Sequence, residues 1–270
     1  MSDLLIEETD YQVKGHRLHA RWLRQPLPLA DRRPVLVFLH EALGSIAMWK
    51  DVPEVLATAC GCHVLIYDRV GHGASAPLPV EMARHDYLYR EAWEFLPSLL
   101  AAAGINRTVL IGHSDGGTIA LLAAAKFPEQ IKGVVAEAAH VLVEACTLQG
   151  IRDTIGSPEL PELKKRIGRY HQLDIEPMFN RWPDIWLAES FAEWSMERFL
   201  PEIRCPLLVI QGEQDQFGSV RQVESMLENA GGHAEALLIP ECGHVPHFQA
   251  REQYLQRIRR FLWQQGLIVD

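Results

Sequence analysis

The sequence lacks long apolar runs, basic clusters and low-complexity stretches, and each absence excludes a class of protein. Its longest apolar stretches, such as residues 119–125, are far too short to cross a bilayer. The 35 acidic residues outnumber the 26 basic ones, the opposite of the balance expected for surfaces that bind nucleic acids or anionic membranes. Nineteen glycines and 16 prolines in 270 residues are too few for a collagen-like chain. With 48% hydrophobic residues, the composition indicates an ordinary globular protein with a sizeable core.

Paired cysteines are also missing. The five cysteines stand at positions 60, 62, 146, 205 and 242, an odd number without a CxxC spacing. This pattern disfavours both a disulfide framework and a structural zinc site. The first ten residues, MSDLLIEETD, contain acids and no apolar run with a basic flank, so no signal peptide is predicted. We therefore expect a protein of the reducing cytoplasm.

Short apolar runs alternate along the chain with longer helical patterns. Two short runs around the Lys14-Gly15 turn signal predict an antiparallel hairpin. Six later runs have the continuous apolar character of buried strands: residues 35–39, 63–67, 108–111, 133–136, 207–210 and 236–239. Helical patterns cover residues 86–103, 114–126, 219–230 and 249–265. The alternation predicts an α/β fold, with a mostly parallel sheet of eight strands covered by helices on both faces.

Residues 141–204 interrupt this alternation because they contain no strand-like run. We predict that they form a helical insertion in a core domain made of residues 1–140 and 205–270. The insertion is rich in large side chains. These side chains either build a small core of their own or, in part, line an apolar cleft as a lid would, and both roles can hold together. They are Met178, Phe179, Trp182, Trp186, Phe191, Trp194 and Phe199.

The strongest chemical signal is TVLIGHSDGG at residues 108–117. A buried strand ends at Ile111, a Gly-x-Ser-x-Gly turn follows, and a helical pattern begins. Small residues such as Gly112 and Gly116 are what a sharp strand-to-helix turn requires, because the serine is held in a strained conformation and its neighbours are crowded. The turn exposes the Ser114 hydroxyl at a helix N-terminus, where developing negative charge is favoured. Ser114 is therefore the predicted nucleophile.

A serine nucleophile needs a base and an orienting carboxylate. His244 follows the last predicted strand in IPECGHVPHF and is the favoured base, with His247 three residues later as the competitor. In LLVIQGEQDQF, Asp215 lies in a loop long enough to reach a histidine and is the favoured carboxylate. Glu213 in the same loop is interpreted as a solvated charge.

Backbone N–H groups near the nucleophile are candidates for an oxyanion hole. The N–H of Asp115 directly follows the serine, while the Asp115 side chain is expected to cap the helix. The second N–H should come from the loop after residues 35–39. Ala42 is the favoured donor there, with Glu41 or Leu43 as alternatives. His40 in this loop is expected to act as a structural hydrogen-bonding residue.

Together these residues resemble the α/β-hydrolase superfamily, and specifically its capped, carboxylesterase-like serine hydrolases. The resemblance covers essentially the whole chain. It rests on LHEALGS at residues 39–45, DRVGHGAS at 68–75, GHSDGG at 112–117, GEQD at 212–215 and CGHVPH at 242–247. The order of nucleophile, acid and histidine matches that family, and residues 141–204 lie where the family carries its cap. The combination is highly specific for the fold and much less so for the substrate.

The resemblance implies a two-stage mechanism. Ser114 attacks a carbonyl, His244 takes its proton and Asp215 stabilises the imidazolium, while the N–H groups of Ala42 and Asp115 hold the oxyanion. An acyl-enzyme forms and water then hydrolyses it. Family members that open epoxides or remove halides have aspartate in place of Ser114, so these two chemistries are disfavoured.

One residue departs from the family pattern. Relatives usually have His-Gly where this chain has His40-Glu41. The Glu41 side chain either turns away into a salt bridge or turn hydrogen bond, or orders the hydrolytic water or sets substrate preference. We therefore include Glu41 among the predicted pocket residues, together with Trp182 and Trp186.

The leading functional hypothesis is an esterase for small, largely apolar acyl substrates. The first alternative is a carbon–carbon bond or enol-lactone hydrolase of aromatic catabolism, whose anionic substrates would require a cation in the pocket. The other alternative is a slow-turnover ligand receptor on a hydrolase scaffold. No cofactor or metal is implied, and the expected partner is a small-molecule substrate, not nucleic acid or membrane; the oligomeric state stays open. Candidate pocket cations in the insertion are Arg152, Lys164, Lys165, Arg166, Arg169 and Arg181.

Overall fold

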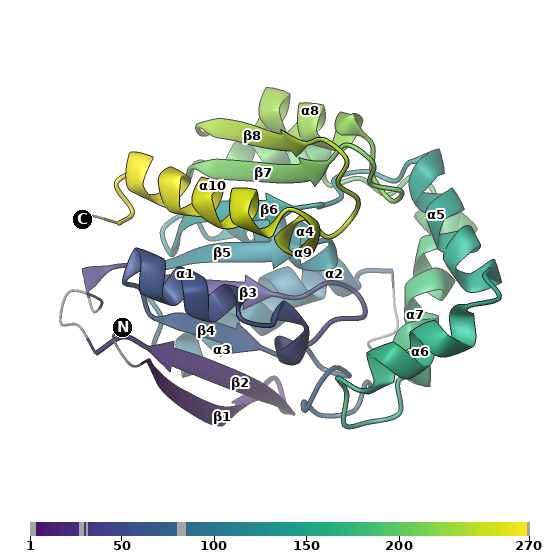
Figure 1. Cartoon of the computed structure of the whole chain (residues 1–270), viewed down its shortest axis with the longest axis horizontal. Coiled ribbons are helices and arrows are strands. Elements are labelled where there is room, and N and C mark those ends of the chain that lie inside the picture. The colour runs from purple at the N-terminus through teal and green to yellow at the C-terminus, as the bar shows by residue number, and fades with distance from the viewer. Residues whose placement is uncertain (1–3, 27–29, 31, 80–84, 269–270) are drawn as a thin grey trace.

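An eight-stranded sheet forms the centre of the protein (Figure 1). The computed structural model describes residues 4–26, 30, 32–79 and 85–268. The strand order is β1-β2-β4-β3-β5-β6-β7-β8. β1 pairs antiparallel with β2 and β2 antiparallel with β4, whereas the remaining pairs are parallel. The strands are β1 Leu5–Val13, β2 His16–Arg24, β3 Val35–Leu39, β4 Val64–Tyr67, β5 Thr108–His113, β6 Ile131–Glu137, β7 Leu207–Gly212 and β8 Ala234–Ile239.

The predicted fold class and hairpin are confirmed, and a strand lies at each of the eight predicted positions. The central strands are apolar throughout because helices cover both faces of the sheet. In β3, Val37 and Leu39 belong to one apolar cluster, while Leu36 and Phe38 belong to the cluster on the opposite face. The alternation of side chains along a strand thus supplies both layers of the core.

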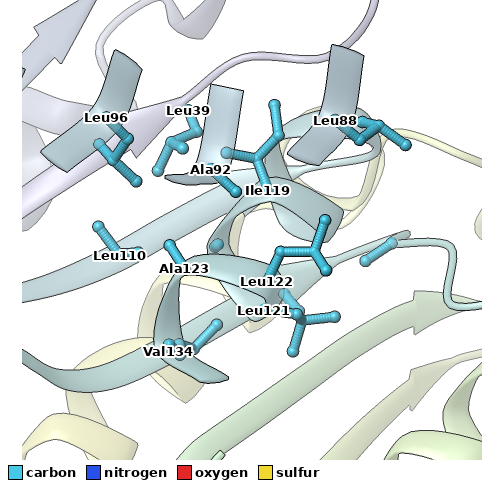
Figure 2. Close-up of a cluster of buried hydrophobic side chains, with 14 of the residues drawn as sticks. Leu39, Leu88, Ala92, Leu96, Leu110, Ile119, Leu121, Leu122, Ala123 and Val134 are labelled. Carbon is cyan, nitrogen blue, oxygen red and sulfur yellow. The ribbon is translucent and has the colours of Figure 1, made fainter. Parts of the chain in front are cut away.

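Helices from distant parts of the chain cover the two faces. Helices α1 (Val52–Cys60) and α10 (Arg251–Gln264) contact each other on the face that contains Leu36 and Phe38. The other face is covered by α3 (Leu96–Ala102), α4 (Asp115–Lys126) and α8 (Val220–Asn229). Figure 2 shows part of this second core, where side chains of α4 and of the helical segment before β5 meet the sheet.

The helices depart from the sequence prediction most clearly in three respects. No helix was expected between β3 and β4, where α1 lies. The predicted helix over residues 86–103 is divided into α2 (Tyr87–Arg90), a π-helical turn (Glu91–Phe95) and α3. The last predicted helix begins at Arg251 instead of residue 249, since the short helix α9 (Pro246–Gln249) precedes it.

The long segment between β6 and β7 is helical. It contains α5 (Ala145–Gly156), α6 (Leu160–Gly168) and α7 (Glu176–Trp186), which lie together beside the edge where the parallel strands end (Figure 1). Hydrogen bonds tie the segment to the core: the Gln172 N–H donates to Gly73 O at 2.9 Å, and the His171 ring bonds Leu43 O at 3.0 Å. Among the described residues, no helix is long and apolar enough to cross a membrane.

Candidate active site

The turn between β5 and α4 holds Ser114 in a strained conformation. Ser114 has φ 52° and ψ −117°, a combination that non-glycine residues rarely adopt. A Cβ on Gly112 would lie 2.2 Å from Gly116 O, and one on Gly116 would lie 2.0 Å from Leu39 O. Only glycine fits at these two positions, which explains the spacing of the motif around the serine.

Ser114 opens onto a cavity of about 370 Å³ at the carboxyl edge of the sheet. The residue is only 8% exposed. His244, from the loop after β8, lines the same cavity. Ser114 and His244 are both described by the structure, and no hydrogen bond joins Ser114 Oγ to the His244 ring. Hydrogen bonds between a nucleophile and its base are often long in substrate-free enzymes.

His244 is paired with Asp215, from the loop after β7. The Nδ1–H of His244 donates to the carboxylate, with Nδ1–O distances of 2.8 and 2.9 Å. The Asp215 side chain is fully buried and accepts further bonds from the Phe217 N–H at 2.8 Å and the Gln211 amide at 2.6 Å. These bonds fix the carboxylate and hence the ring, leaving Nε2 as the nitrogen available to take up a proton.

The pKa values of this pair are shifted in the direction that general-base chemistry needs. Burial alone would lower the pKa of His244, but the charge and hydrogen bond of Asp215 raise it above its ordinary value. Burial would raise the pKa of Asp215, but the charge of His244 and the bonds to the carboxylate lower it. The pair is therefore arranged to stabilise an imidazolium.

The two competing residues have different surroundings from His244 and Asp215. His247 lines the cavity, but its Nδ1 bonds the buried carboxylate of Glu137 at 2.8 and 2.9 Å. Glu213 is exposed, as expected for a solvated charge. Sequence reasoning did not single out Glu137, whose partner is 110 residues away along the chain.

The loop after β3 presents the predicted oxyanion donors. Within the described chain, the Ala42 N–H donates to no protein acceptor. The Leu43 N–H donates to the Glu41 carboxylate, so Leu43 is occupied as a donor. Asp115 is the first residue of α4, and its N–H has no carbonyl one helical turn earlier to bond. Ala42 and Asp115 both line the cavity with Ser114.

Buried polar side chains hold this loop in place. His40 Nε2 accepts from the Arg69 N–H at 3.0 Å, so its Nδ1–H donates to Glu41 O at 2.8 Å. The Arg69 guanidinium donates to the same oxygen at 2.8 Å, and the His72 ring bonds Ala42 O at 3.0 Å. Burial and the charge of Arg69 lower the pKa of His40 well below its ordinary value. These contacts agree with the structural hydrogen-bonding role expected for His40.

The expected helix cap by the Asp115 side chain is wrong. Among the described residues, the Asp115 carboxylate accepts no backbone N–H of α4, because it is directed into a buried cluster. It accepts a hydrogen bond from the Tyr87 hydroxyl at 2.9 Å and lies 3.7 Å from Arg69 Nη1. Trp186 donates in turn to the Tyr87 hydroxyl at 3.0 Å. The cluster links the nucleophile turn to α7, a connection that no local sequence pattern signals.

Apolar side chains form most of the cavity wall. Glu41, Trp182 and Trp186 all line it, as predicted for the pocket. None of the lining residues that the structure describes is lysine or arginine. Of the six candidate cations, Lys164 pairs with Glu176 at 2.7 Å, and Arg181 is buried against the Tyr87 ring. The others are exposed: Arg152, Lys165, Arg166 and Arg169.

Comparison with known proteins identifies the family. Residues 36–257 match the model of the alpha/beta hydrolase family. The chain belongs to this family. Its fold, the strained serine turn and the helical segment between β6 and β7 are consistent with that assignment.

Relatives of this alpha/beta hydrolase carry several different activities in their names. The chain is 28% identical over 205 residues to the mouse protein "Serine hydrolase BPHL", covering 74% of this chain and 69% of the relative. It is 21% identical over 298 residues to a Lactobacillus acidophilus proline iminopeptidase, covering 94% of each. A structure of 2-hydroxy-6-oxo-6-phenylhexa-2,4-dienoate hydrolase from Rhodococcus sp. strain RHA1 has a TM-score of 0.75 at 17% identity, covering 97% of this chain and 100% of that one. Family and relatives support hydrolase activity, while the bond that is cleaved differs among them.

The described part of the chain contains no group of three or more His, Cys, Asp or Glu side chains that could hold a metal ion. His16 and His19, three residues apart in the sequence, lie on β2, where His19 pairs with Asp10 and Glu8.

Proposed function

We propose that this alpha/beta hydrolase cleaves carboxylic esters of small, largely apolar substrates through Ser114, His244 and Asp215. One observation carries the proposal: a serine held at positive φ and a carboxylate-paired histidine open onto the same mainly apolar cavity of about 370 Å³. A cavity of this size suits a small ligand, and its few polar groups converge where a carbonyl would react.

In the first stage of the proposed reaction, the Ser114 hydroxyl attacks the ester carbonyl. The hydroxyl proton passes to His244 Nε2 as the new C–O bond forms, and the buried Asp215 carboxylate stabilises the imidazolium. The carbonyl oxygen becomes an oxyanion held by the N–H groups of Ala42 and Asp115. Collapse of this intermediate breaks the ester C–O bond, and the leaving alcohol takes the proton from His244.

In the second stage, water hydrolyses the acyl-enzyme. His244 removes a proton from the water as its oxygen attacks the acyl carbonyl, and the same two N–H groups hold the second oxyanion. The bond to Ser114 then breaks, and His244 returns the proton to the serine oxygen. The carboxylic acid leaves and the enzyme is restored.

We assign residues 141–204 the role of a cap on the core domain of residues 1–140 and 205–270. Trp182 and Trp186 of α7 line the cavity. An apolar substrate group that packs against these rings is removed from water, which favours its binding. In this proposal, the aromatic side chains divide between the two expected roles. Phe191 is buried and stacks on Trp194 at 5.3 Å, whereas Trp182 and Trp186 face the site.

We also propose that the protein acts on a small-molecule substrate in the reducing cytoplasm. All five cysteines are free thiols. Burial raises the pKa of Cys60 and of Cys62 to about 12 each, which keeps both thiols protonated and unreactive. These features suit a compartment in which disulfides do not form.

A panel of p-nitrophenyl esters from acetate to octanoate, with lactone, thioester and dienoate substrates, tests the function. We expect a short or medium ester to be the best substrate and Ser114→Ala to lower its kcat by about 10⁴-fold or more, because the nucleophile is lost. Circular dichroism of the variant controls for folding.

Full turnover by Ser114→Ala would refute the mechanism, and a dienoate as best substrate would favour carbon–carbon cleavage. Undiminished ligand-dependent partner binding by Ser114→Ala, with negligible turnover in the wild type, would favour the receptor alternative.

A further inference from the structure

Two acidic residues, Glu41 and Asp115, line the otherwise mainly apolar cavity. The Asp115 carboxylate is engaged by the Tyr87 hydroxyl and lies 3.7 Å from Arg69, whereas Glu41 makes no such contact with a cation among the described residues. Glu41 lies between His40, which is fixed by hydrogen bonds, and Ala42, the proposed oxyanion donor. The carboxylate accepts the Leu43 N–H, which holds it within the loop that faces Ser114. The chain thus places an acidic side chain where a bound acyl group would lie close to it.

The charged side chains behind the cavity are paired mainly with one another and not with Glu41. Arg69 and Arg181 are buried, and so are Asp115 and Glu91, giving two guanidinium groups and two carboxylates that influence one another electrostatically. Arg69 also attracts Glu41, but its guanidinium lies 3.7 Å from Asp115. Burial raises the pKa of Glu41, whereas the Leu43 N–H and the charges of Arg69 and His244 oppose this shift and favour the carboxylate form.

Few other groups around the cavity can carry a positive charge. His244, whose pKa is raised, also attracts Glu41, but its ring is paired with Asp215. None of the described lining residues is lysine or arginine. Burial lowers the pKa of His113 to about 3 and also lowers the pKa of His140, so both rings stay neutral at physiological pH. A substrate carboxylate would meet a like charge inside a small, poorly hydrated space, where Coulomb repulsion is weakly screened.

We propose that Glu41 is a specificity-determining residue that excludes acyl groups carrying a carboxylate, so that the cavity accepts uncharged esters. The inference rests on the proposed ester hydrolysis. A like charge placed against a competing ligand weakens the binding of that ligand and so raises specificity for the uncharged one. The Trp182 and Trp186 rings would then select for apolar character while Glu41 rejects anions.

The test compares two acyl chains of similar length with the same leaving group: p-nitrophenyl pentanoate, which is neutral, and mono-p-nitrophenyl glutarate, which is anionic. Rates are corrected for uncatalysed hydrolysis, and the readout is the ratio of the two kcat/KM values. Glu41→Gln removes the charge but keeps an oxygen that can accept the Leu43 N–H. Glu213→Gln removes the same charge from an exposed residue outside the cavity wall and serves as the matched control.

We expect the wild type to favour the neutral ester by about 100-fold, Glu41→Gln to lower this ratio by about tenfold, and Glu213→Gln to leave it within twofold. Should Glu41→Gln fail to fold, Glu41→Ala carries the same expectation for the ratio. A wild-type ratio near one, an unchanged ratio in the Glu41 variant, or an anionic ester that stays uncleaved by both proteins would overturn the inference. Failure of the wild type to cleave either ester would instead count against the proposed function.

Discussion

Two histidine–carboxylate pairs lie side by side in this molecule, and their difference shows what makes one of them a candidate base. His244 bonds Asp215, and His247 bonds Glu137, each with an Nδ1–O distance of 2.8 Å to a fully buried carboxylate. The two rings also contact the same neighbour, His113, with ring centroids 5.1 and 5.0 Å apart. Local geometry alone therefore does not distinguish them.

The surroundings of the two pairs are different. The Glu137 carboxylate also accepts the backbone N–H of His247 at 2.8 Å, so it fixes the chain as well as the ring. The His247 ring is packed between Trp49 and Phe248, with centroids 4.8 and 4.2 Å away. His113 bonds the carbonyl of His244 at 2.8 Å and so connects this support to the candidate base. We infer that the second pair positions the loop on which His244 stands.

Substitution of each histidine should give the largest difference in activity between the two pairs. We expect His244→Gln to lower kcat by about 10⁴-fold, because the proton of the nucleophile then has no acceptor. His247→Gln should lower it by only about tenfold, through displacement of the loop. The measurement is ester turnover at saturating substrate. Equal losses in the two variants would contradict the assignment, and a larger loss in His247→Gln would reverse it.

Isosteric substitution of the two carboxylates should give a second, smaller difference in kcat between the pairs. We expect Asp215→Asn to reduce kcat by about 10³–10⁴-fold, because the amide orients the wrong imidazole tautomer. Glu137→Gln should reduce kcat by about tenfold and the free energy of unfolding by about 1–3 kcal/mol, since two buried donors of His247 lose a charged acceptor. Urea unfolding with parallel turnover assays checks both variants. A Glu137→Gln protein that is fully stable but inactive would show that this pair takes part in the chemistry.

The fold was predictable because its signals are local. The apolar runs of the central strands and the Gly-x-Ser-x-Gly turn are each read within about ten residues. Helix α1 was missed although it has a sequence signal: Pro53 stands in its first turn, and Gly61 follows it with φ 58°. Proline at the start and glycine after the end are typical of helices.

The site was predictable only where it follows strand ends. Because parallel strands end at one edge of the sheet, residues after β5, β7 and β8 were expected near one another, and Ser114 and His244 do line one cavity. The partner of each side chain was harder to predict. Asp115 bonds Tyr87 and Glu137 bonds His247, and these pairs form only when segments 28 and 110 residues apart are packed together. The catalytic roles themselves stay predictions until they are measured.

The smallest expected effect is the influence of the Glu137 charge, in the second pair, on the pKa of His244, in the first. Burial alone would lower the pKa of His244, but the charges of Asp215, Glu41 and Glu137 raise it above its ordinary value of 6.5. As a base His244 must be neutral, so kcat/KM should be lost as pH falls through this raised pKa, and the midpoint of the acidic limb should lie above 6.5.

Removing the charge of Glu137 tests whether the second pair acts on His244 electrostatically as well as by position. Glu137→Gln should move the acidic midpoint of kcat/KM to lower pH by less than one unit, and Glu41→Gln should move it further in the same direction, because its charge raises the pKa more. Burial lowers the pKa values of the neighbouring rings of His113 and His140, so both titrate at lower pH than His244. Glu213→Gln, an exposed charge, provides the control. An unchanged midpoint in Glu137→Gln would mean that the pair acts on His244 through its position alone, and a midpoint at higher pH would contradict the electrostatic argument.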